Sequence, residues 1–147
     1  MKKNLTVRDI SPHIFNSVYA NFLKKSGRIE IPSWINIVKT GLSKKNSPTD
    51  PNWFFLKMAS LARKFYLNRG KGIGNLKKEF GRKKRNGVRP SRKMKSSGKI
   101  IRLALQMLEK LKIIGWNKKG KRIISKKAKL DMDKRAEKLC SIKKNKF

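Results

Sequence analysis

The fold is set by the stretch WFFLKMASLARKFYLN, residues 53–68, which is apolar around nearly its whole circumference. Asp50-Pro51 precedes it as a helix-start signal, because proline suits the first turn of a helix. The stretch therefore predicts a central helix buried by its neighbours. Its one polar stripe, spaced at i, i+3, i+6 and i+7, is expected to emerge at the surface and consists of Lys57, Ser60, Arg63 and Lys64.

Three further helices are predicted around this one. The first runs from Ser11-Pro12 to a stop at Ser26-Gly27, the next covers residues 99–112, and the last follows Ser125. Each has one apolar face at helical spacing. The inner residues we expect are Ile14, Phe15, Val18, Phe22 and Leu23 in the first, Ile101, Leu105, Leu108 and Leu111 in the next, and Met132, Ala136, Leu139 and Cys140 in the last.

Shorter elements complete the predicted architecture. A brief helix is expected from about Trp34 to Gly41, and residues 113–124 form a two-stranded hairpin with a basic tip at 118–120. A helix followed at once by a basic hairpin is the local order of a winged-helix module. We predict one mainly α, winged-helix-like domain over residues 1–147, with a basic tail at 143–147 that frays.

Residues 69–98 differ in character from the rest of the chain. They contain six of the ten glycines, interleaved with Lys and Arg, and only Leu76 to Phe80 could form a helical turn. We expect a basic, Gly-rich loop that binds nucleic acid, because glycine lets the backbone approach phosphates and the cations neutralise them. The alternative is a solvated linker. Gly70, Gly72 and Gly74 resemble part of a dinucleotide fingerprint, but they follow a helix and not a strand.

Composition narrows the class of function. The 147 residues carry 41 Lys or Arg against 8 Asp or Glu, a net charge of +33 that would repel itself without a polyanionic partner. One Cys and one His cannot build a disulfide framework or a zinc finger, and the scattered carboxylates form no acid–base pair. No apolar run approaches the ~20 residues of a membrane span. We expect a protein without catalytic activity, metal, cofactor, small-molecule substrate or membrane.

The candidate RNA-binding residues come from the central helix, the Gly-rich segment and the outer face of the predicted helix at residues 99–112. Solvated surface charge is the alternative for each, and residues 82–85 equally resemble a nuclear import signal. Trp116 in the hairpin could stack on a base or pack in the core. The candidates are Lys57, Arg63, Lys64, Arg69, Lys71, Arg82, Lys83, Lys84, Arg85, Arg89, Arg92, Lys95 and Arg102.

Two other functions fit a strongly basic chain. A DNA-binding winged-helix or chromosome-compacting protein would place the helix at 99–112 in the major groove, but Gln106 and Glu109 point outward there and few cations accompany them. A cationic membrane-surface protein would need an amphipathic helix with a basic polar face, whereas the apolar helices here are expected to bury one another. Charge spread over loops on several sides favours irregular RNA.

An ordered set of motifs covers nearly the whole chain and resembles the eukaryotic and archaeal type of small-subunit ribosomal protein nineteen. The resemblance implies a winged-helix-like protein of the subunit head, bound to rRNA and neighbouring ribosomal proteins and needed for rRNA maturation. It also implies a cytoplasmic ribosome location, with nuclear or nucleolar assembly. The motifs are Trp53-Phe54, Ala59-Ser60-Leu61-Ala62-Arg63, Tyr66-Leu67, Gly72-Ile73-Gly74, Arg85-Asn86-Gly87-Val88-Arg89-Pro90-Ser91 and Leu105-Gln106-Met107-Leu108-Glu109.

Overall fold

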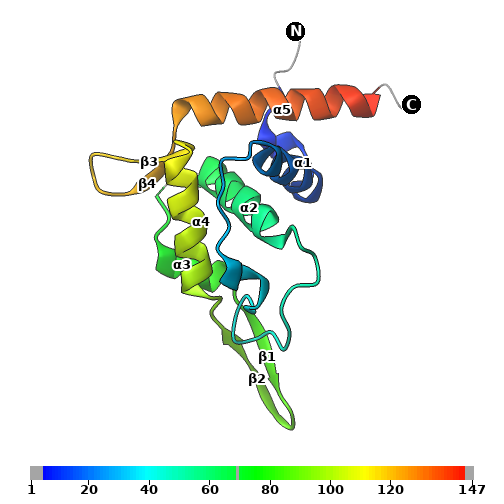
Figure 1. Ribbon diagram of the computed structural model, residues 1–147, viewed down its shortest axis with the longest axis vertical. Coiled ribbons are helices and arrows are strands. Elements are labelled where there is room, and N and C mark those ends of the chain that lie inside the picture. Colours follow the sequence, from blue (N-terminus) through cyan, green and yellow to red (C-terminus); the bar gives the residue numbers. More distant parts are fainter. Residues whose placement is uncertain (1–4, 69, 145–147) are drawn as a thin grey trace.

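A computed structural model describes residues 5–68 and 70–144, and helix α2 (Trp53–Leu67) lies at its centre (Figure 1). It contacts α1 (Pro12–Lys25), α4 (Gly98–Lys110) and strand β4 (Arg122–Ile124). The predicted central core helix is therefore confirmed. Its buried residues are Phe54, Phe55, Met58, Ala59, Leu61, Ala62, Phe65 and Tyr66.

Helix α1 packs along α2 and begins and ends where its sequence predicts. Pro12 occupies the first turn, and Gly27 beyond the C-terminal end has a φ of +63°, a region that favours glycine. Phe15 and Tyr19 stack with ring centroids 5.6 Å apart. The buried face is rotated slightly from the predicted one, because Tyr19 and Ala20 are buried while Ile14 and Val18 are only half-buried.

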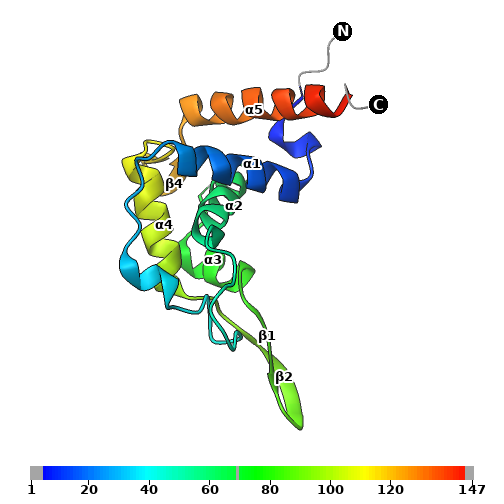
Figure 2. The ribbon, with the colours of Figure 1, turned by 45° about the vertical axis from the view of Figure 1, so that its right-hand side comes forward.

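The hairpin predicted at residues 113–124, here called the wing, and the last helix also follow their predicted order. Strand β3 (Ile114–Trp116) pairs antiparallel with β4, and α5 (Lys126–Lys144) begins directly after Ser125. The Ser125 Oγ accepts a hydrogen bond from the Ala128 N–H at 3.2 Å, which caps that helix. Helix α5 crosses one end of the molecule and buries Met132 and Ala136 (Figures 1 and 2). The mainly α, winged-helix-like fold with a small hairpin is confirmed.

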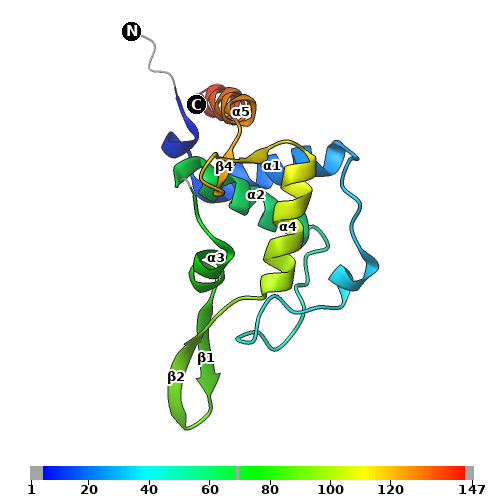
Figure 3. The ribbon, with the colours of Figure 1, turned by 90° about the vertical axis from the view of Figure 1, so that its left-hand side faces the viewer.

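The segment predicted as a basic loop is instead built from regular elements. Helix α3 (Ile73–Glu79) leads into a second hairpin, β1 (Arg82–Asn86) and β2 (Arg89–Met94), which extends away from the body at the end opposite α5 (Figure 3). Leu76 is fully buried and anchors α3, which packs on α4. Gly87 opens the two-residue turn with a φ of +68°. The expectation of a largely structureless loop is thus wrong.

The brief helix is a 3₁₀ turn at Ser33–Asn36, ending earlier than Gly41. Arg69, and the side chains that would test the basic tail at 143–147, lie outside the described residues. Within the described chain, no helix is both long and apolar enough to cross a membrane.

Candidate nucleic-acid interface

The hairpin β1–β2 concentrates exposed positive charge more than any other predicted part of the site. Its side chains are exposed along both strands except at Asn86 and Met94, which are half-buried. In register, Lys83 lies opposite Lys93 and Lys84 lies opposite Arg92. Like charges directly opposite one another destabilise a β-ladder. The cations on and next to this hairpin are Arg82, Lys83, Lys84, Arg85, Arg89, Arg92, Lys93 and Lys95.

No local carboxylate relieves this repulsion. Residues 80–108 contain no Asp or Glu, and none of the ion pairs found among the described residues involves a hairpin cation. The hairpin is held by its backbone ladder, its glycine turn and its root. At that root a Cβ on Gly81 would lie 2.4 Å from the Met94 carbonyl oxygen, so only glycine lets the strands approach this closely.

Both faces of the hairpin carry charge. Successive side chains on a strand point to opposite faces, so the Lys83–Lys93 pair and the Lys84–Arg92 pair lie on different faces. The register shifts between Lys84 and Asn86, where the single residue Arg85 of β1 faces two residues of β2, Pro90 and Ser91, so the extra residue lies in β2. The hairpin can therefore meet phosphates on either side.

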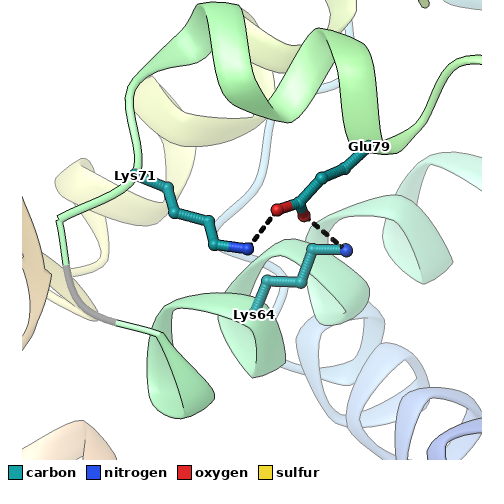
Figure 4. A network of polar contacts seen from close by, with 3 residues as sticks. All are labelled: Lys64, Lys71 and Glu79. Carbon is teal, nitrogen blue, oxygen red and sulfur yellow. Dashed lines mark hydrogen bonds and ion pairs between the residues drawn. The ribbon is translucent and has the colours of Figure 1, made fainter.

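The cations of α2 lie against the end of α3, immediately before this hairpin. Lys64 Nζ is 2.6 Å from Glu79 Oε2, and Lys71 Nζ pairs with the other carboxylate oxygen of Glu79 (Figure 4). Hydrogen bonds from Lys64 and then Lys71 lower the pKa of the Glu79 carboxyl below its usual value. One carboxylate thus ties α2 and residue 71 to the root of the hairpin.

Lys57 is the most perturbed cation of the candidate set. Its Nζ lies 3.4 Å from the centroid of the Phe80 ring, and Lys64 Nζ lies 4.9 Å from the same centroid. Burial, and secondarily the charge of Lys64, lower the pKa of Lys57 from 10.5 to about 8. The polar stripe of α2 therefore emerges at the surface only in part, because α3 and Phe80 cover one side of it.

Arg63 stands apart from these contacts. Its side chain is half-buried, and its Nε is buried without a hydrogen-bond partner among the described residues. An unpaired buried donor costs stability, so the fold gains no hydrogen bond from Arg63 at this atom. Arg102 is exposed on the second turn of α4, and Lys95 is exposed just beyond β2. The contacts of Phe80 and Glu79 thus join Lys57, Lys64 and Lys71 to the hairpin root, whereas Arg63 takes no part in these contacts.

A second basic region was not predicted from the sequence. A hollow of about 380 Å³ lies between the end of α2, the β3–β4 turn and the start of α5. Four cations from three separate segments line it, namely Arg8, Lys121, Lys126 and Lys129. Each segment is ordinary for so basic a chain, and only the tertiary fold brings them together. Among the described residues, no three His, Cys, Asp or Glu side chains gather to hold a metal ion.

Fold and surface together define a mainly α, winged-helix-like protein with a projecting cationic hairpin, whose cations form none of the ion pairs found among the described residues. Residues 6–142 match the family model of Ribosomal protein S19e, and the chain belongs to that family. The protein named small ribosomal subunit protein eS19 of Oryza sativa subsp. japonica is 45% identical over 128 residues, which cover 87% of this chain and 88% of that protein. Its namesake in Dictyostelium discoideum is 40% identical over 144 residues, 97% of each chain.

Proposed function

We propose that this protein is a structural constituent of the small ribosomal subunit that binds rRNA in the subunit head and supports small-subunit rRNA maturation. Membership of the S19e family and relatives named as small-subunit proteins support this. The protein acts by holding RNA, without turnover. Its working location is the cytoplasmic ribosome, with assembly in the nucleus or nucleolus.

The observation that carries the RNA-binding role is the like-charge register of β1–β2. A hairpin that sets Lys83 against Lys93 and Lys84 against Arg92 without a nearby carboxylate is destabilised on its own. Phosphates on both faces would relieve that repulsion, and each contact would release condensed counterions. RNA, whose folded strands offer phosphates from several directions, suits a two-faced hairpin better than one groove of a duplex.

The candidate residues have different parts in this proposal. The hairpin residues Arg82, Lys83, Lys84, Arg85, Arg89 and Arg92 take phosphates directly, while Lys57, Lys64 and Lys71 fix the hairpin root through Phe80 and Glu79. Arg63 uses its fork on a separate phosphate, and Arg102 and Lys95 extend the surface. Arg69, which lies outside the described residues, stays a proposed RNA contact. Glu109 on α4 is half-buried and pairs with Arg122 at 2.5 Å, so the case against DNA binding through α4 rests on the few cations that this helix exposes.

Crosslinking in cells followed by sequencing of the attached RNA tests the proposal. We expect crosslinks concentrated in small-subunit rRNA segments of the head, and their loss at the hairpin sites when Lys84 and Arg92 are both changed to Ala. Lys138→Ala, at an exposed position on α5, is the matched control and should leave those crosslinks in place. Crosslinks to duplex DNA in their place would support a chromosomal protein and overturn the proposal.

Depletion of the protein tests its role in assembly. Precursors of small-subunit rRNA should accumulate, and a hairpin variant with Lys84 and Arg92 changed to Ala should fail to clear them, whereas Lys138→Ala should succeed. Normal precursor processing on depletion would remove maturation from the proposal.

A further inference from the structure

Trp116 on the β3–β4 wing is the one tryptophan whose ring the fold leaves open to solvent. It is 58% exposed, whereas Trp34 and Trp53 are partly buried against the core. An indole left in water contributes little to folding by burial. Packing in the core therefore does not explain why a tryptophan occupies this position on the wing.

The orientation of this ring is held from within the wing. Arg122 is the cross-strand neighbour of Trp116, and its guanidinium carbon lies 4.4 Å from the indole centroid. Arg122 Nε donates in turn to Glu109 Oε1 of α4 at 2.5 Å. A carboxylate on a rigid helix thus fixes an arginine that covers one side of the indole. The remaining exposed surface of the ring is held ready for a flat partner.

The surroundings of the ring are cationic, and the adjacent turn is closed by backbone hydrogen bonds. The turn after Trp116 is closed by the Asn117 N–H, which donates to the Lys121 carbonyl at 2.8 Å, and by the Gly120 N–H, which donates to the Asn117 carbonyl at 2.9 Å. Three exposed lysines occupy it, and residues 114–124 contain no carboxylate. They are Lys118, Lys119 and Lys121. A flat aromatic face beside lysines on a hydrogen-bonded turn matches the chemistry that binds unpaired nucleotides.

We infer that Trp116 is a stacking platform for an unpaired base of RNA, with the lysines of the wing turn neutralising the adjacent phosphates. This inference rests on the proposed rRNA binding and adds a second contact, because the wing lies on the body near α5 while β1–β2 projects from the opposite end (Figure 1). The hairpin gives charge neutralisation alone, whereas the wing selects RNA that offers an unstacked base.

Binding of purified variants to two RNAs tests the inference. The probes are a stem–loop with a single-stranded loop and a fully paired duplex with the same number of phosphates. Trp116→Ala should weaken stem–loop binding about 5- to 150-fold, leave duplex binding unchanged and leave the salt dependence unchanged. Changing Lys118 and Lys119 together to Ala should weaken both RNAs and lower the slope against log salt concentration by about 1.4–1.8.

Two further measurements keep the outcome decisive. Trp116→Phe should retain part of the stem–loop affinity, and the quenching of intrinsic tryptophan emission by the stem–loop should disappear in that variant. Equal weakening of both RNAs by Trp116→Ala, or no weakening of either, would overturn the inference. A variant that binds RNA normally but enters small subunits poorly would assign Trp116 to a neighbouring protein and also overturn it. If the unaltered chain binds neither RNA, the proposed rRNA binding is wrong, and the inference that rests on it is overturned as well.

Discussion

The Oη of Tyr66 donates a hydrogen bond to Oδ1 of Asp133 at 2.7 Å, joining the central helix α2 to α5 across 67 positions of sequence. The Val7 N–H approaches the same carboxylate oxygen at 3.4 Å. The Asp133 carboxylate therefore accepts hydrogen bonds from both the N-terminal segment and the core helix. Burial, and then the bond to Asp133, raise the pKa of Tyr66 to about 12, so the phenol remains a donor throughout the physiological pH range.

The first prediction removes this hydrogen bond. Tyr66→Phe should lower the free energy of unfolding by about 1–3 kcal/mol, because the carboxylate of Asp133 loses its best donor in a partly buried place. Denaturant titration would show a lower midpoint with an unchanged slope. Asp131→Asn is the control, since the ion pair of Asp131 with Arg135 is a partly exposed i,i+4 contact and should cost below about 0.5 kcal/mol. Equal effects of the two variants would contradict the prediction.

The second prediction concerns the buried amine of Lys57. Its pKa is lowered to about 8 in the folded state against 10.5 unfolded, so the unfolded chain binds more protons between these values. The buried charge therefore destabilises the fold by a constant amount below about pH 8, and this penalty is relieved as pH rises from about 8 to about 10.5. Relative to Lys57→Met, the unaltered protein should gain about 1–2 kcal/mol across that window, after allowance for solvent screening of a half-buried group.

Unfolding free energies measured from pH 7 to 11 on both proteins would test this. The lysines of the chain all titrate at high pH, so the quantity to compare is the difference between the two proteins at each pH. Lys78→Met, an exposed position on α3, is the matched control and should show no such trend. A constant difference between the unaltered protein and Lys57→Met would show that the amine is not buried in solution.

The sequence predicted the helices and the wing well, because each buries an apolar face whose spacing is visible in the chain. The same reasoning missed β1–β2, since a strand is recognised by alternating apolar residues and residues 82–94 have almost none. Asn86-Gly87, a dipeptide typical of tight hairpin turns, was the only local signal of this hairpin. The contact of Phe80 with Lys57 was beyond prediction, because it depends on how α3 packs beside α2.

The third prediction tests whether Arg63 contacts RNA or instead stabilises the fold. Arg63→Met should leave the free energy of unfolding unchanged or raise it by up to about 1 kcal/mol, because it removes a buried Nε without a partner among the described residues. RNA affinity should nevertheless fall, since the fork that binds phosphate is gone. Phe54→Ala, in the core of the same helix, should cost about 3–5 kcal/mol. Thermal melting that ranks Arg63→Met beside Phe54→Ala would make Arg63 a structural residue.

The last prediction reverses one charge in the hairpin. Lys93→Glu places a carboxylate opposite Lys83, so a like-charge pair becomes an opposite-charge pair. The free hairpin should gain about 0.2–1 kcal/mol, seen as slower hydrogen exchange of its amides. RNA affinity should fall at the same time, and the slope of log affinity against log salt should shrink by about 0.7–0.9 for the phosphate contact that is lost. Stability and binding would thus move in opposite directions.

Two companion variants make this result specific. Lys138→Glu changes the net charge by the same amount on the exposed side of α5 and should alter neither the exchange of the hairpin nor the salt slope. Adding Lys83→Glu to Lys93→Glu restores like-charge repulsion with the opposite sign, so the hairpin should exchange fast again while RNA affinity falls further. This double variant separates ladder stability from phosphate contact, because residues 83 and 93 again repel each other while the hairpin has lost two cations and gained two carboxylates. If Lys93→Glu bound RNA as tightly as the unaltered protein, the hairpin would not be the phosphate-binding element.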